Sequence, residues 1–302
     1  FLKRGIRNQM RSLSKLPRAL VLSLRLLLRF KPDLVVGVAS YVSGPVALAA
    51  KVMRIPVLIH EQNILPGITN RILARFAARV CISFEGTRIG SDPSKIVVTG
   101  NPVRHDLLQI SRPGRKERSG NNIGPFTVLI LGGSQGAHRI NATVAAAIQY
   151  ISPKENFYFI HQTGSDDETF MKNACHSLGI RCRVKPFFEK MASAYGHADL
   201  VICRAGATTV AELSAIGIAS ILIPFPHAAD DHQVKNARIM KMAGAAEIVL
   251  EKELHPEKLA SRIAYYASNR TALNAMSSRA ASLGKPHAAE AVVDESYRLM
   301  GA

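Results

Sequence analysis

The chain has 302 residues and a formal net charge of +17, from 39 Lys and Arg against 22 Asp and Glu. This length allows two domains with sizeable cores, and the 47% hydrophobic content excludes a disordered or fibrous chain. None of the four cysteines belongs to a CxxC pair, which argues against a disulfide framework. Cys175, Cys182 and His176 form too small a set for a zinc site, so buried free thiols in a reducing cytosol are favoured.

The first 31 residues contain nine Lys and Arg and no acidic side chain. Leucines at helical spacing between them predict a basic amphipathic helix that is broken near Pro17. Arg18 and Arg25 interrupt an apolar stretch that is already too short to span a bilayer. The segment is therefore typical of a helix that lies on an anionic membrane surface. A solvated helix face and a nucleic-acid patch are the alternatives, and the second lacks the interleaved aromatic residues of single-strand binders.

The rest of the chain alternates short β-branched runs with helical patterns. In the first half, helices are predicted around 46–53 and 70–76, and strands at 34–38, 56–60, 80–83 and 96–99. A polar, glycine-rich stretch at 111–125 has the composition of a linker. Beyond it, helices are predicted near 167–178 and at 290–300, and strands at 127–131, 157–161, 183–186, 200–203 and 220–224. This alternation predicts parallel sheets with binding loops at the carboxyl ends of their strands.

A glycine-rich turn follows the strand predicted at 127–131. Gly132, Gly133 and Gly136 surround Ser134 and Gln135, and a helical pattern begins soon afterwards. Glycines let backbone N–H groups approach an anion closely, and the first turn of a helix adds a partial positive charge. A diphosphate is the expected occupant, and plain strand–helix packing is the alternative.

Two further loops carry polar side chains after predicted strands. Arg204 follows the strand at 200–203 and is placed to meet a phosphate, and Glu212 on the next helix can accept hydrogen bonds from a ribose. A first-turn acid that interacts with the helix dipole is the alternative for Glu212. His232 and Gln233 lie where a proline-rich loop enters a helix. The adjacent acids at 230–231 and 166–167 are expected to cap helices, and no metal site is predicted.

Seven short segments occur together along the chain in a fixed order. They read S-Y-V-S-G-P (40–45), H-E-Q-N (60–63), P-G-I-T-N (66–70), V-T-G-N-P-V-R (98–104), G-G-S-Q-G-A with Asn141 (132–141), R-A-G-A-T-T-V-A-E (204–212) and H-Q-V-K-N-A (232–237). Each is weakly specific alone, but the set resembles the MurG family of bacterial peptidoglycan glycosyltransferases. The resemblance covers essentially the whole chain.

The resemblance implies an α/β fold of the GT-B class, with two Rossmann-like parallel-sheet domains facing a cleft and the first domain incomplete. We expect an acceptor- and membrane-facing domain at 1–104 and a linker at 105–125. A UDP-sugar-binding domain is expected at 126–286, and a terminal helix at 287–302 that returns to the first domain.

The resemblance also implies roles for individual residues of this chain. Glu61 is the remaining carboxylate candidate for the catalytic base, and a buried strand-end acid bonded to backbone amides is the alternative. Tyr41, Ser43 and Asn70 match positions on the acceptor side. The positions expected to bind the donor are Asn63, Arg104, Gly132, Gly133, Ser134, Gln135, Gly136, Asn141, Arg204, Glu212, His232 and Gln233.

The implied activity is inverting transfer of N-acetylglucosamine from UDP-N-acetylglucosamine to the C4 hydroxyl of N-acetylmuramate in undecaprenyl-linked lipid I, giving lipid II. No metal or other cofactor is expected, and neither is nucleic acid. The expected location is the cytoplasmic face of the bacterial plasma membrane, reached through the basic residues of 1–31. A UDP-N-acetylglucosamine 2-epimerase, a transferase with another acceptor, and a non-catalytic membrane module that keeps nucleotide binding are the rival interpretations.

Two departures from the family pattern matter. The family's glycine-rich loop with a histidine near the N-terminus has no counterpart in this chain, and Ala39 and Ser40 stand where the family usually has glycines. If the backbone there needs positive φ, each substitution costs about 1 kcal/mol. We therefore expect the chain as given to bind the donor weakly and to transfer little sugar.

Overall fold

The computed structural model describes residues 16–38, 42–110, 124–133, 136–228 and 231–301. The chain divides into two compact units, which are described separately. Unit 1 comprises residues 1–101 and 287–302, and unit 2 comprises residues 102–286. The predicted helix over 1–15 and most of the predicted linker lie outside the described residues.

Unit 1 contains a four-stranded parallel sheet in the order β1-β2-β3-β4. Its strands are β1 (Val35–Val38), β2 (Val57–Glu61), β3 (Arg79–Ile82) and β4 (Ile96–Val98), with the short 3-10 helix η1 (Pro93–Lys95) before β4. Every residue of β2 is buried, as expected for an interior strand of a parallel sheet that is covered on both faces. The helices in the described part of this unit are α2 (Leu16–Phe30), α3 (Ser43–Val52), α4 (Ile68–Leu73) and α13 (Ala288–Met300).

A buried carboxylate fixes the terminal helix of unit 1 to its sheet. Glu295 on α13 is only 4% exposed, and its Oε2 lies 2.8 Å from the Nε of Arg79 at the start of β3. Arg298, one turn further along α13, forms an ion pair with the same carboxylate. A buried acid with two arginine partners keeps its charge compensated, which makes this contact specific for one helix position.

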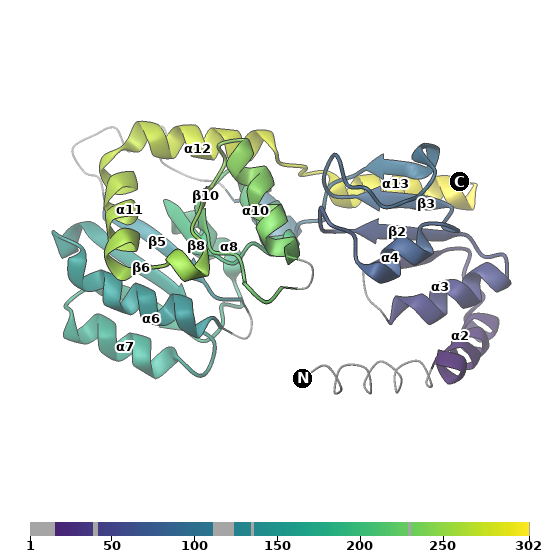
Figure 1. Cartoon of the computed structure of the whole chain (residues 1–302), viewed down its shortest axis with the longest axis horizontal. Helices are drawn as coiled ribbons and strands as arrows, with labels where there is room; N and C mark the ends of the chain where they lie inside the picture. Colours follow the sequence, from purple (N-terminus) through teal and green to yellow (C-terminus); the bar gives the residue numbers. More distant parts are fainter. Residues whose placement is uncertain (1–15, 39–41, 111–123, 134–135, 229–230, 302) are drawn as a thin grey trace. The chain divides into compact units, whose positions relative to one another are not determined.

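Unit 2 contains a six-stranded parallel sheet in the order β10-β9-β8-β5-β6-β7 (Figure 1). The strands are β5 (Phe126–Leu131), β6 (Phe157–Gln162), β7 (Arg181–Lys185), β8 (Leu200–Cys203), β9 (Ala219–Leu222) and β10 (Glu247–Ile248). The helices are α5 (His105–Leu108), α6 (His138–Ala147), α7 (Glu168–Ser177), α8 (Met191–His197), α9 (Ala207–Ile216), α10 (His232–Met242), α11 (Pro256–Ser268) and α12 (Arg270–Ser282). The 3-10 helices are η2 (Ile148–Tyr150), η3 (Lys154–Asn156) and η5 (Glu251–Glu253).

The strand order of unit 2 reverses at β5, which pairs with β6 on one side and with β8 on the other. Leu131, the last residue of β5, is in register with both Gln162 of β6 and Cys203 of β8. The loops that follow these strands therefore start at the same level of the sheet. Ligands of open α/β sheets bind beyond the carboxyl ends of the strands at such a reversal.

The predicted fold class, two Rossmann-like α/β units with parallel sheets, is confirmed. Some elements differ from the sequence prediction. Residues 105–108, assigned to a linker, form α5 and pack on α8 and α9 of unit 2. β10, α11 and α12 were not predicted. The strand expected at 220–224 ends at Leu222, two residues before Pro224, which has no N–H to continue the ladder.

Candidate functional site

The loops at the carboxyl edge of the unit 2 sheet bring together most of the predicted donor-side residues. Gly132–Gly136 follow β5, Arg204–Gly206 follow β8, and residues 223–231 follow β9. β5, β8 and β9 are consecutive neighbours in the sheet, so their loops are adjacent along one edge. Ser134 and Gln135 lie outside the described residues.

Main chain packs directly against main chain in the loop after β5. A Cβ on Gly136 would lie 2.2 Å from the carbonyl oxygen of Thr163, and a Cβ on Gly132 would lie 2.6 Å from the backbone nitrogen of Ala137. Gly136 also has φ +76°, in the left-handed region. No other residue fits this conformation and this spacing. The loop leads into α6, whose N-cap residue Ala137 provides no capping side chain.

Asn141 on α6 joins the helix to the loop that follows β6. Its Nδ2 donates to the carbonyl of Thr163 at 2.9 Å and to Oδ2 of Asp167 at 2.8 Å. With both amide hydrogens used, its Oδ1 is the acceptor that faces Nε2 of His161 at 2.8 Å. Asn141 is fully buried, so it braces the corner and leaves no polar atom free for a ligand.

His161 and Asp167 complete this network and were not predicted as site residues. Asp167 also accepts from Nδ1 of His138, the first residue of α6, at 2.8 Å. Burial lowers the pKa of His161 to about 3, because a charged imidazole has no water at this position. His161 is a polar residue inside a buried strand and Asp167 is the N-cap residue of α7, and only their pairing with Asn141 reveals their role.

Glu212 lies on α9 and is half-buried. Its Oε2 accepts a hydrogen bond from the hydroxyl of Tyr195 on α8 at 2.9 Å. Burial raises the pKa of Glu212, while the Tyr195 hydrogen bond and the charge of Arg104 oppose that rise. Arg104, at the start of α5, therefore acts electrostatically on Glu212, and Asp106 on the same helix acts in the opposite direction. Tyr195 was not predicted as a site residue.

Arg204 is held by the loop after β9 and by η5. Its Nη1 lies 2.5 Å from Oε2 of Glu251 and donates to the carbonyls of Ile223 and Pro224. Its guanidinium also lies 5.3 Å from the ring centroid of Phe225. These contacts order the loop. The sequence indicated only that Arg204 follows a strand, not which groups it meets.

His232 and Gln233 begin α10, as predicted for this loop. Oε1 of Gln233 accepts from the backbone N–H of Phe225 at 3.0 Å, which fixes the helix start against the loop after β9. Asn236, one turn later, is fully buried and its Nδ2 donates to the carbonyl of Ala205 at 3.3 Å. Asn236 thereby links α10 to the loop after β8 and was not singled out from the sequence.

Three of the predicted residues of unit 1, Glu61, Asn63 and Asn70, lie together at the end of β2. Glu61 is fully buried, and its carboxylate accepts from the backbone N–H of Asn63 at 2.9 Å, from that of Gly67 at 3.1 Å, and from Nδ2 of Asn70 at 2.9 Å. This is the arrangement of the strand-end acid bonded to main-chain amides. Ser43 is the first residue of α3, and Tyr41, Ala39 and Ser40 lie outside the described residues.

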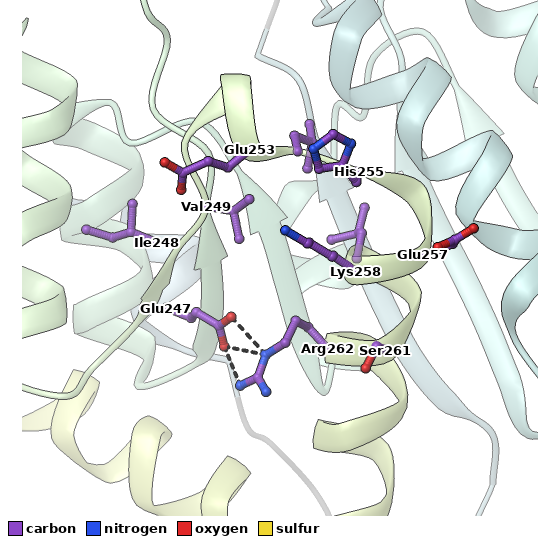
Figure 2. Close-up of a pocket in the computed structure, with 11 residues that line it drawn as sticks. Glu247, Ile248, Val249, Glu253, His255, Glu257, Lys258, Ser261 and Arg262 are labelled. Atoms are coloured by element: carbon purple, nitrogen blue, oxygen red, sulfur yellow. Dashed lines mark hydrogen bonds and ion pairs between the residues drawn. The ribbon is translucent and has the colours of Figure 1, made fainter.

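A separate cavity of about 500 Å³ lies beside β10 and α11 in unit 2 (Figure 2). Glu247 and Arg262 form an ion pair at its wall, with a closest distance of 2.6 Å. None of the predicted site residues lines it. Within the described part of the chain, no cluster of three or more His, Cys, Asp or Glu side chains is arranged to hold a metal ion.

Comparison with known proteins decides the family. A protein of Syntrophus aciditrophicus named UDP-N-acetylglucosamine--N-acetylmuramyl-(pentapeptide) pyrophosphoryl-undecaprenol N-acetylglucosamine transferase is 44% identical over 292 residues, which cover 96% of this chain and 80% of the relative. The crystal structure of Acinetobacter baumannii MurG matches with a TM-score of 0.78 and 35% identity, over 93% of this chain and 79% of that one. This chain belongs to the MurG family.

Both parts of the chain match the wider glycosyltransferase family 28. Residues 1–82 match its N-terminal domain and residues 127–292 its C-terminal domain. A UDP-GlcNAc 2-epimerase from Neisseria meningitidis shares the fold, with a TM-score of 0.67 over 94% of this chain and 81% of its own, but only 15% identity. The MurG family member described here is thus related to the epimerase in fold alone, whereas its likeness to MurG extends through the sequence.

Replacing Gly136 by alanine tests the packing of the glycine corner. Gly133→Ala is the matched control, because Gly133 has φ +86° but no atom of the described residues lies within 4 Å of an added Cβ. We expect Gly133→Ala to lower the free energy of unfolding by about 1 kcal/mol and Gly136→Ala by about 3 kcal/mol, since only the second adds a main-chain clash. Urea denaturation measures both, and equal losses would contradict the packing argument.

Because His161 is buried in its neutral form, we expect the free energy of unfolding of unit 2 to fall at acidic pH. The pKa of His161 is about 3 in the folded protein, whereas an unfolded histidine has a pKa of about 6.5. Between these two pH values the unfolded state therefore binds one more proton at this residue than the folded state does. This group's contribution to stability is complete above that range and decreases by about 1.4 kcal/mol per pH unit as pH falls through it. Denaturation at several pH values should show a shallower slope for His161→Gln. The same slope in both proteins would refute the assignment, and exposed His176→Gln is the control.

Proposed function

We propose that this chain transfers N-acetylglucosamine from UDP-N-acetylglucosamine to undecaprenyl-linked lipid I, producing lipid II for peptidoglycan. The observation that carries the proposal is the 44% identity, over 96% of the chain, to a relative with that enzyme name. The order of loops at the carboxyl edge of unit 2 supports it, because a glycine corner and a ribose-type carboxylate follow neighbouring strands.

In the proposed donor site, the diphosphate lies at the corner between β5 and α6. The backbone N–H of Gly133 and the uncapped start of α6 are its donors, with Ser134 as the side-chain donor. The N–H groups of Gly132 and Gly136 donate instead to the carbonyls of Gln162 and Gly133. Glu212 accepts from the ribose hydroxyls. Gln135, Arg104, His232 and Gln233 are proposed to line the donor, while Asn141 and Arg204 act by holding the loops through the contacts described above.

The proposed reaction requires the site to stabilise the departing UDP. Attack of the C4 hydroxyl of N-acetylmuramate on the anomeric carbon inverts the α-linked donor to a β1,4 bond and releases UDP. Negative charge grows on the diphosphate in the transition state, where fixed backbone dipoles stabilise it without reorganisation. The UDP-sugar is therefore the only small molecule the proposal requires besides the acceptor.

On the acceptor side, Tyr41 and Ser43 are proposed to contact lipid I. Asn70 is buried and donates to the carbonyl of His60 and to the carboxylate of Glu61, so we propose that it holds this loop. Glu61 holds the loop between β2 and α4 through three donors, so we propose that it positions this loop. A general base must approach the hydroxyl it deprotonates within hydrogen-bond distance, and the buried carboxylate of Glu61 meets protein groups instead.

We further propose that the enzyme works at the cytoplasmic face of the plasma membrane, held there by its basic leading segment. α2 packs on α3 and turns Leu22, Leu26 and Phe30 to solvent, with Phe30 78% exposed. Arg18, Arg25 and Arg29 are exposed on the same helix. None of the helices in the described ranges is long and apolar enough to span a bilayer. Attachment from one side fits apolar side chains flanked by arginines.

A transfer assay tests the function. With UDP-N-acetylglucosamine labelled in the sugar and a short-chain lipid I analogue, we expect label to appear in the lipid fraction above an enzyme-free blank, with one UDP released per sugar. Glu212→Gln should weaken UDP binding about tenfold or more, because it replaces the charged acceptor of the ribose hydroxyls. Calorimetry with UDP measures that loss.

Three outcomes would count against the proposal. Unchanged UDP affinity in Glu212→Gln would remove the ribose role. Label that becomes an epimerised sugar nucleotide, with none in lipid, would favour the epimerase. Vesicle binding without any transfer would favour a non-catalytic membrane module.

Vesicle cosedimentation tests the membrane proposal. The chain should bind vesicles containing anionic phospholipid, and added salt should weaken binding because it screens the arginines. Phe30→Glu combined with Leu26→Glu should reduce binding about tenfold or more, since both apolar side chains are lost and acids are added. Met242→Glu, at a residue 88% exposed in unit 2, is the control. Equal binding by all three proteins would overturn the proposal.

A further inference from the structure

Tyr195 and Glu212 form a buried pair beneath the proposed ribose site. Tyr195 is fully buried in the last turn of α8, yet its hydroxyl lies 2.9 Å from Oε2 of Glu212 on α9. A buried phenol without a partner is costly, and the carboxylate is the partner this hydroxyl has. The pair therefore restrains Glu212 through a ring that cannot move away.

Packing around α8 fixes the position of this donor. α8 packs against β5, and α5 packs against both α8 and α9. Ile110, two residues after α5, lies close to Gly196, with its Cγ2 3.5 Å from where a Cβ of that residue would be. The helix that carries Tyr195 therefore packs on the same strand, β5, that leads into the glycine corner.

The two carboxylate oxygens of Glu212 have different surroundings. Oε2 of Glu212 accepts from Tyr195, while the structure records no hydrogen bond to Oε1 from a described residue. A carboxylate oxygen accepts more than one hydrogen bond, so a fixed group with one free oxygen suits the two adjacent hydroxyls of a ribose.

We propose that Tyr195 is a positioning residue that orients Glu212 toward the ribose diol and thereby sets the preference for ribonucleotide over 2′-deoxyribonucleotide donors. This inference rests on the proposed role of Glu212 in donor binding. Tyr195 acts through Glu212 and touches no substrate itself. Without its hydroxyl the carboxylate loses its fixed rotamer, and the free oxygen no longer discriminates the 2′-hydroxyl.

Binding of UDP and of 2′-deoxy-UDP measures the preference directly. By calorimetry, the unmodified chain should bind UDP about tenfold more tightly than 2′-deoxy-UDP. Tyr195→Phe should weaken UDP binding about fivefold and leave 2′-deoxy-UDP binding within about twofold, so that the ratio falls to about two. Glu212→Gln should bring the ratio to about one.

The chain offers a matched control in the same unit. The hydroxyl of Tyr266 donates to Oε2 of Glu247 at 2.7 Å, and this carboxylate lies at the wall of the cavity beside β10 (Figure 2). Tyr266→Phe removes the same kind of hydrogen bond at a different place. It should leave the UDP to 2′-deoxy-UDP ratio unchanged, and thermal melts should show that all variants fold.

A pH profile separates positioning from a merely structural role. The hydroxyl of Tyr195 favours the charged carboxylate, so its removal should shift the acid-side loss of UDP binding to higher pH. The other ionisable groups that act on this pair are Arg104, Asp106 and Cys203, and all remain in the variant. Tyr266→Phe should keep the original profile.

The possible failures are distinct. If Glu212→Gln abolishes the preference and Tyr195→Phe keeps both the preference and the pH profile, the positioning role is wrong and the ribose role of Glu212 stands. If Glu212→Gln keeps the preference for UDP, the ribose role fails and the positioning role fails with it.

Discussion

Everything at the carboxyl edge of unit 2 depends on how closely two stretches of main chain approach at the β5–α6 corner. Gly136 lies against the carbonyl of Thr163, where even a methyl group would meet the oxygen at 2.2 Å. Because β5 and β6 pair side by side, this contact sets the depth at which α6 starts relative to the sheet. The direction of the helix and of its N–H groups follows from that depth.

Buried amides hold the loops in both units by the same means. Asn141 ties α6 to the residues after β6, and Asn70 on α4 ties its helix to Glu61 at the end of β2. In each case a helix asparagine donates to a backbone carbonyl and to a carboxylate. The Nδ2 groups of both asparagines are fully used in these contacts, which favours one conformation of each loop. Some positions that match the family's site residues, such as Asn141 and Asn70, thus hold the loops of the site in place through buried hydrogen bonds.

Charge is used locally despite the net charge of +17. Arg204 forms an ion pair with Glu251 and donates to the loop after β9, and Arg79 forms an ion pair with Glu295. These two cations therefore stabilise the structure. Arg104 remains exposed and acts on Glu212. The exposed arginines of α2 stand beside exposed leucines and Phe30. The same residue type therefore serves loop order, donor electrostatics and, as proposed, membrane attachment.

The sequence by itself determined the α/β class, the positions of nearly all longer strands and the family, because buried parallel strands and glycine turns leave local patterns. It did not reveal β10, which has only two residues, although Pro256 at the start of α11 was a usable helix signal. Only the tertiary structure decided which groups these side chains contact. The carboxylate of Glu61 accepts from amides, Arg204 forms an ion pair with Glu251, and the hydroxyl of Tyr195 donates to Glu212. Arg204 and Glu251, like Tyr195 and Glu212, are far apart in the sequence, and the order of the strands, which no local pattern encodes, brings each pair together.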